Sequence, residues 1–257
     1  MWSVALKATW KQNFYMMRRY LFNTLAGFIT LYIVFALLFH GTRAVGAGTM
    51  NLGDTLEGMF AGYVTWMLAL MGCTDLAWNI TNEAQSGTLE QLCLSPLGYK
   101  WVLVFNQSFT FFANFLVVGL ITVSMSLTTG QAIHMDLVSV IPVVLAIYVQ
   151  ALGLGFVLAG LALIYKRIQA VFQIVQFALI GFFFVPFDAF PVARYLPLTE
   201  GRKLLQEVLM GGIRIWQTQW ADLGPMLAAT ALYIVAGVAC FAVAESKARS
   251  RGLLGQY

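Results

Sequence analysis

The chain has 257 residues, of which 60% are hydrophobic and only 10% are charged, and its mean hydropathy is +0.78. Soluble domains carry about 25% charged residues, so this composition excludes the soluble class. The net charge of +4 comes from basic residues at the ends of apolar runs rather than from a separate basic patch, so nucleic acid is not an expected partner.

Residues 1–20 have an amphipathic pattern. The apolar stripe consists of Trp2, Leu6, Trp10, Phe14 and Met17, at helical spacing. The neighbouring cations are Lys7, Lys11 and Arg18. We expect a helix that lies in the membrane interface, with its tryptophans inward and its cations toward lipid phosphates. A signal peptide is the alternative, with 44–47 as a cleavage site, but the apolar run from Leu21 to Phe39 is longer than the usual apolar region of such a peptide.

Six apolar runs follow, each near or above the roughly 20 residues that span a bilayer. Their approximate bounds are 21–40, 57–78, 101–128, 137–165, 168–187 and 225–244. We therefore expect an all-α integral membrane protein, with residues 1–257 forming one transmembrane domain. On the fourth run, Ala151, Gly155 and Ala159 form a ridge of small residues at helical spacing, which predicts close helix packing.

Basic residues indicate the orientation, because they are enriched in cytoplasmic loops. With a cytoplasmic N-terminus, most of them fall on the cytoplasmic side, namely Lys7, Lys11, Arg18, Arg19, Lys100, Lys166, Arg167, Lys247, Arg249 and Arg251. This places both termini and residues 79–100 in the cytoplasm. Residues 188–223 then lie outside, where they are too apolar for a free loop, so we expect short re-entrant helices in the outer leaflet. Thr199 is the predicted N-cap of one of them.

The polar segment 79–100 contains a predicted short helix. Thr88 and Gln91 fit a capping box, and Gly87 permits a sharp turn before it. Leu89 and Leu92 share one face, from which Glu90 and Gln91 point away, and Pro96 ends the helix. A helix of about two turns is unstable alone, so it needs a partner surface or the bilayer. An ordinary interfacial helix is the alternative.

The residues Glu83-Ala84-Gln85-Ser86-Gly87-Thr88-Leu89-Glu90-Gln91-Leu92 with Ser95-Pro96-Leu97 resemble the coupling segment of type-2 permeases of ATP-binding-cassette exporters. A second similarity is Leu196-Pro197-Leu198-Thr199, after the fifth run. The resemblance implies an exporter subunit in a bacterial inner (plasma) membrane. The subunit would pair with a second copy of itself or a homologous permease, and with two cytoplasmic ATPase subunits.

Under this resemblance, the ATPase-coupling residues would be Glu83, Gly87, Thr88, Leu89, Glu90, Gln91, Leu92 and Pro96. Runs one and five would line the translocation path. On run five, Phe183, Phe187 and Phe190 fall on one helical face and are candidates for a gate, although contact with lipid also accounts for phenylalanines there. The cargo would be hydrophobic or amphipathic: a drug, lipid, lipid-linked glycan or peptide.

The chain has no phosphate-binding loop of the pattern Gly-x4-Gly-Lys-Ser/Thr, so we expect no bound cofactor, with ATP and Mg²⁺ held by the partner ATPase. The two histidines and three cysteines are dispersed, so no metal site is expected. No catalytic cluster supports an enzyme, including one that acts on lipids. An ATPase-independent transporter or channel is the alternative. Asp75 is an intramembrane candidate for such a role, although its position near a run's end favours simple solvation.

Overall fold

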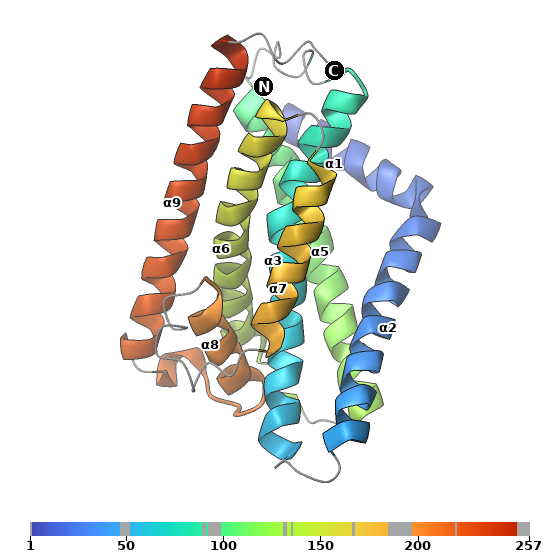
Figure 1. Cartoon of the computed structure of the whole chain (residues 1–257), viewed down its shortest axis with the longest axis vertical. Coiled ribbons are helices and arrows are strands. Elements are labelled where there is room, and N and C mark those ends of the chain that lie inside the picture. Colours follow the sequence, from blue (N-terminus) through green and yellow to red (C-terminus); the bar gives the residue numbers. More distant parts are fainter. Residues whose placement is uncertain are drawn as a thin grey trace.

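The computed structural model describes residues 2–46, 52–88, 91, 99–130, 133–134, 136–165, 168–184, 197–218 and 220–250. All regular structure within these residues is helical, which confirms the all-α prediction for this part of the chain (Figure 1). The helices are α1 (Trp2–Arg19), α2 (Leu21–Gly46), α3 (Leu52–Gln85), α5 (Tyr99–Thr129), α6 (Leu137–Ile164), α7 (Gln169–Phe184), α8 (Thr199–Leu209), the 3₁₀ helix η3 (Ile215–Gln217) and α9 (Trp220–Ser250).

Five helices in the described residues are long and apolar enough to cross a membrane, which confirms the prediction of an integral membrane protein. The candidate spans are Leu21–Ala44, Gly58–Gln85, Trp101–Thr129, Leu137–Ile164 and Trp220–Ser250. The remaining predicted run, 168–187, corresponds to α7, of which 16 residues are described. A helix of that length is about 24 Å long, shorter than the roughly 30 Å hydrocarbon core. The sixth span therefore stays a prediction.

Helix α3 continues beyond the apolar run that predicted it. It reaches Gln85, so residues 79–85, which we had expected in a polar loop, are helical. The helix ends where the backbone turns at Gly87, whose φ of +70° lies in the left-handed region. A fall in hydropathy does not end a helix, whereas a left-handed glycine does.

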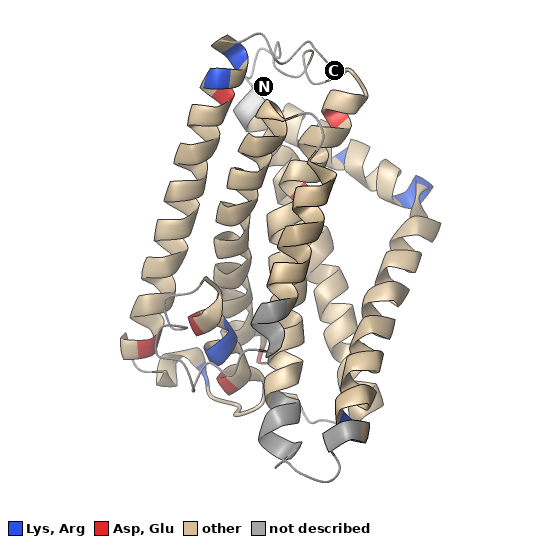
Figure 2. Cartoon of the chain, viewed as in Figure 1, with Lys and Arg blue, Asp and Glu red and all other residues tan. Residues whose placement is uncertain are grey.

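The two ends of the helical bundle carry different elements (Figure 1). Helix α1, the end of α3 and the end of α9 lie together at one end, and α8 lies at the other. Charged residues are concentrated near these two ends, and the long helices between them are largely free of charge (Figure 2). The sequence predicts that the N-terminus and residue 83 lie on one side of the membrane and that the segment after run five lies on the other. This arrangement agrees with that prediction.

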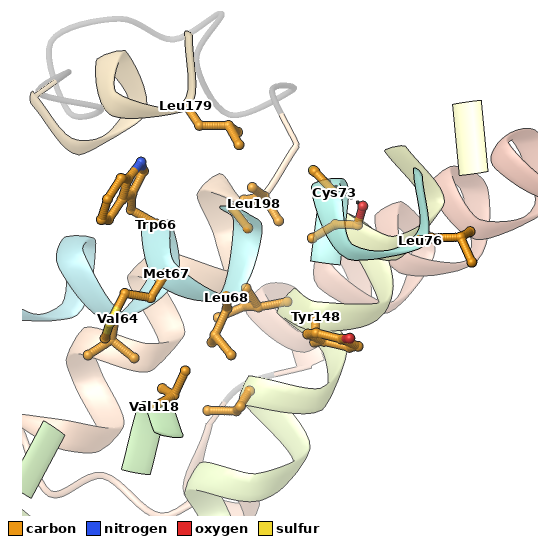
Figure 3. Packing of buried hydrophobic residues seen from close by; sticks show 14 of the residues in the cluster. Val64, Trp66, Met67, Leu68, Cys73, Leu76, Val118, Tyr148, Leu179 and Leu198 are labelled. Carbon is orange, nitrogen blue, oxygen red and sulfur yellow. Dashed lines mark hydrogen bonds between the residues drawn. The ribbon is translucent and has the colours of Figure 1, made fainter. Parts of the chain in front are cut away.

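Helix α6 is packed between α3 and α9 through glycines on two of its faces. A Cβ added at Gly155 would lie 2.4 Å from the carbonyl oxygen of Gly72 on α3, and one at Gly153 would lie 2.4 Å from that of Tyr233 on α9. Real Cβ atoms do not approach so closely, so only glycine permits this spacing. The predicted close packing of the small ridge is confirmed. Large side chains of α3 fill the neighbouring core with residues of α5, α6 and α7 (Figure 3).

Helix α1 is amphipathic as predicted and packs across α5. The Nε1 of Trp10 donates to the Oγ of Ser108 at 2.9 Å, and the Nδ2 of Asn13 donates to the Oδ1 of Asn106 at 2.7 Å. The Trp2 ring meets the Trp101 ring edge-on, with centroids 4.4 Å apart. The predicted cations Lys7, Lys11 and Arg18 are all exposed. The tryptophans therefore point to the bundle and the cations away from it.

The start of α8 is bonded to the bundle by a buried amide, that of Gln150 on α6. Its Oε1 accepts from the backbone N–H of Leu198 at 3.0 Å, and its Nε2 donates to the Oγ1 of Thr230 on α9 at 3.0 Å. The N-cap of α8 is Leu198, in the left-handed conformation with φ of 71°. The prediction that Thr199 is the cap was therefore wrong. Thr199 is already helical because the chain turns one residue earlier, at the amide held by Gln150.

A surface ion pair joins α8 to the start of α9. The Nζ of Lys203 donates to the Oδ1 of Asp222 at 3.0 Å, and this hydrogen bond raises the pKa of Lys203 above its ordinary value. Because folding raises this pKa, the stabilisation of the fold by the ion pair is present at neutral pH. It is lost only as pH rises through the raised pKa. Desolvation raises the pKa of Glu207, which lies 3.9 Å from Lys203. The pair is exposed to solvent, so it adds no more than about 1 kcal/mol.

Candidate functional site

Asp75 is a carboxylate that lies among the transmembrane helices. It lies on α3 and is half-buried, and its Oδ2 accepts a hydrogen bond of 2.6 Å from the Nδ2 of Asn114 on α5. Asn114 stands near the middle of α5, far from either end of that helix. Asp75 therefore has a partner on a neighbouring helix in addition to any solvent that reaches it, and its role stays a prediction.

A second polar pair lies on the same side of α5. Gln107 is seven positions before Asn114, which is two helical turns, so both side chains project from one face. The Nε2 of Gln107 donates to the hydroxyl of Tyr148 on α6 at 2.8 Å. The face of α5 turned toward α3 and α6 thus carries two polar contacts within an otherwise apolar bundle. The packing of Gly72 on α3 against Tyr148 and Ala151 on α6 holds those two helices together beside them.

The chemistry available to these four side chains is binding and proton exchange rather than covalent catalysis. Of the four, only Asp75 ionises readily. Among the residues that the structure describes, no group of three or more histidine, cysteine or carboxylate side chains could hold a metal ion. Polar residues inside a membrane often mark a transport path or a helix contact. Sequence analysis missed Asn114, Gln107 and Tyr148. The signal available for the first two was a pair of amide residues two helical turns apart in the third apolar run, and Tyr148 had no such signal.

The end of α3 is closed by a Schellman motif in the segment where coupling was predicted. The N–H of Thr88 donates to the carbonyl of Glu83 at 3.0 Å, and the N–H of Gly87 donates to that of Ala84 at 3.1 Å. The Thr88 hydroxyl also donates to the Glu83 carboxylate. Glu83 therefore stabilises the turn at which the chain leaves α3. The same bonds fix the orientation of the Glu83 side chain.

No protein-family model and no curated protein matches this chain. The similarity to the type-2 permeases therefore rests on the residues quoted for it, and membership of that family stays a hypothesis.

The predicted functional residues are only partly within the described structure. Of the coupling residues, Glu83, Gly87 and Thr88 form the turn after α3, and Gln91 is helical and exposed. The others, Leu89, Glu90, Leu92 and Pro96, lie outside the described residues. Of the gate candidates, Phe183 belongs to α7, where only its backbone is described, and Phe187 and Phe190 lie outside the described residues. The predicted N-cap role of Thr88 and the gate stay predictions.

Replacing Gly87 by Ala is expected to loosen the end of α3. No atom lies within 4 Å of an added Cβ, so the cost arises only from the left-handed backbone and amounts to about 1 kcal/mol. Hydrogen exchange of the last turn of α3 should accelerate about fivefold. Gly27→Ala is the matched control, since Gly27 also has open space but an ordinary helical backbone. Equal exchange in the two variants would contradict the role assigned to Gly87.

Proposed function

We propose that this chain is the permease subunit of an ATP-binding-cassette exporter. It forms the translocation path together with a second permease subunit, and two separate ATPase subunits drive transport. The observation that carries the proposal is the segment from Glu83 to Leu97, which has the residue pattern of a coupling helix. It begins at a rigid turn, since the Schellman motif and the bond between Thr88 and Glu83 fix the exit from α3. A push on this segment would be transmitted to the most buried helix of the bundle.

The arrangement of the other elements supports the same assignment. Helix α1 lies at the same end as the exit from α3, and α8 lies at the opposite end (Figure 1). Under the proposal, the first end faces the cytoplasm of a bacterium, where the ATPases bind. The sixth span would be the predicted run 168–187, of which α7 is the described part. The cargo that the resemblance implies is hydrophobic or amphipathic.

The test is reconstitution of the full chain in liposomes with the ATPase encoded beside its gene. We expect a stable complex whose ATP hydrolysis depends on this chain. Glu83→Ala and Glu90→Ala should each lower that hydrolysis about tenfold, because each removes a charge expected to face the ATPase. Thr88→Val isolates the local bond, since it removes the hydroxyl but keeps the Glu83 charge. Glu200→Ala, on α8 at the opposite end of the bundle, is the control carboxylate.

The outcome of these variants decides the proposal. Failure of the ATPase to bind, or full hydrolysis in both Glu83→Ala and Glu90→Ala, would contradict it. A loss in Thr88→Val equal to that in Glu83→Ala would assign Glu83 to the turn alone.

A transporter that works without an ATPase is the second candidate, and the contact between Asp75 and Asn114 favours it. A carboxylate held between transmembrane helices is the kind of group that couples proton or sodium movement to transport. Cargo movement driven by an ion gradient in liposomes that contain this chain alone would support this candidate, and its abolition by Asp75→Asn would identify the coupling group.

A further inference from the structure

A groove of about 390 Å³ lies between the last turns of α6 and α9. Gly160 and Ala244 are buried at its floor, where a Cβ added to the glycine would lie 2.9 Å from the Cβ of Ala244. The larger apolar residues that line it are Val157, Leu161, Ile164 and Val243. Its volume falls within the range of sites that hold small ligands. The groove is separate from the turn after α3 to which coupling is assigned.

A single cation lies at one end of this apolar groove. Lys247 is the only charged residue among the described residues that line it, and it is exposed. It forms an ion pair with none of the acidic side chains that the structure describes. The nearest acidic residue along α9, Glu245, is bonded to Arg249 at 2.7 Å, and the sequence beyond Ser250 contains no acidic residue. The last turn of α9 therefore supplies no counter-charge to Lys247.

The position of Lys247 along α9 corresponds to the head-group region of the membrane. It lies three residues beyond the apolar run 225–244, which is about 4.5 Å along the helix, and the head-group region is about 5–7 Å thick on each side. Tyr165, the residue that ends α6, is exposed beside the same end of the groove, as is typical of a tyrosine at that level. From Lys247 to Ala239 the groove extends about 12 Å inward, close to the roughly 15 Å of hydrocarbon in one leaflet.

We propose that this groove binds an anionic phospholipid, whose phosphate pairs with Lys247 and one of whose acyl chains lies between α6 and α9. Lysine binds phosphate as a point charge, and a cation beside the head groups attracts anionic lipids. A zwitterionic lipid is disfavoured, because its net charge is zero. An apolar protein surface is also disfavoured, because it would bury the charge of Lys247 without a partner. The proposal does not depend on the exporter assignment, since it concerns only residues of this chain and the membrane around them.

The experiment uses the full chain in nanodiscs of phosphatidylcholine that contain a trace of phosphatidylglycerol with a diazirine in its acyl chain. The diazirine is photolysed, and the labelled peptides are identified by mass spectrometry. We expect labels on α6 between Val157 and Ile164 and on α9 between Ala239 and Lys247. Unlabelled phosphatidylglycerol should compete for this labelling about fivefold better than phosphatidylcholine at equal mole fraction, the preference expected from one lysine beside an anionic head group.

Two variants, each with a matched control, separate a site from general contact with lipid. Lys247→Gln should abolish the fivefold preference, whereas Arg19→Gln, which removes an exposed cation of α1 outside the groove, should retain it. Ala239→Trp should fill the inner part of the groove and remove the label from both helices. Ala228→Trp is its control, since Ala228 is exposed on the same side of α9, eleven residues earlier, and does not line the groove. All four positions are exposed, so none of these variants removes a core side chain.

Any of four results overturns the proposal. The first is a preference for phosphatidylglycerol that is unchanged in Lys247→Gln, and the second is labelling in Ala239→Trp at the level seen in Ala228→Trp. The third is the absence of label from both helices in the natural chain, as expected if a second copy of the chain covers the groove. The fourth is stronger competition by oleate than by phosphatidylglycerol, which would assign the groove to a free fatty acid.

Discussion

A Gly237→Val substitution is expected to lower the free energy of unfolding by about 3 kcal/mol, the upper end of the usual cost of overpacking. An added Cβ on Gly237 would lie 2.0 Å from the carbonyl oxygen of Gly153 and 2.7 Å from its carbonyl carbon. Both are backbone atoms of α6, so no side-chain rotation can relieve the contact. Helices α6 and α9 must move apart, and in a membrane their association depends on this close packing.

The measurement is reversible unfolding of the chain in bicelles, and the control is Gly119→Val. Gly119 is also within a transmembrane helix, α5, but has no atom within 4 Å of an added Cβ. Gly119→Val should therefore change the free energy of unfolding by less than about 0.5 kcal/mol. Gly237→Ala should lie close to Gly237→Val, because the clash begins at the Cβ itself. Equal stability of Gly237→Val and Gly119→Val would show that α6 and α9 do not need this approach.

The packing of α6 shows how far sequence patterns predict this fold. The spacing of Ala151, Gly155 and Ala159 predicts a packing ridge on the fourth run, and the structure confirms it. The spacing does not identify the partner helices, because every neighbouring run is apolar and lipid is as apolar as another helix. In the structure, the partner helices approach α6 at Gly72 and Gly237, which are isolated glycines with no pattern of their own.

Helix ends were predicted less well than helix identity, for a related reason. Hydropathy marks where a helix enters the polar region, whereas backbone geometry marks where it ends. Helix α3 therefore continues to Gln85, and α9 runs from Trp220 to Ser250, well beyond the predicted run 225–244. The turn at Gly87 was predicted correctly because a glycine before Thr88 is itself a geometric signal.

The site among the helices was the least predictable part. Asp75 and Asn114 are 39 residues apart, and nothing in either run indicates that they meet. A lone carboxylate near the end of an apolar run has the same sequence pattern whether water or an amide on another helix satisfies it. Only the arrangement of α3 against α5 distinguishes the two cases.

The contact between Asp75 and Asn114 is expected to couple α3 to α5 by about 1–2 kcal/mol. Hydrogen bonds between transmembrane helices average about 0.6 kcal/mol and reach about 1.7 kcal/mol, and one that joins an amide to a carboxyl group at 2.6 Å belongs to the strong end. Asn114→Leu should lower the free energy of unfolding by about 2 kcal/mol, because the half-buried carboxyl loses its donor.

A double-mutant cycle isolates this coupling from the cost of each change. Asp75→Leu/Asn114→Leu should be less destabilised than the sum of the single variants, since replacement of both partners leaves no unpaired polar group. The matched control is the cycle of Gln107→Leu and Tyr148→Phe, a neutral pair at 2.8 Å between α5 and α6, for which about 0.6 kcal/mol is expected. Strict additivity in the first cycle would mean that Asp75 is satisfied by something other than Asn114. The solvated carboxylate first inferred from the sequence would then be the better description.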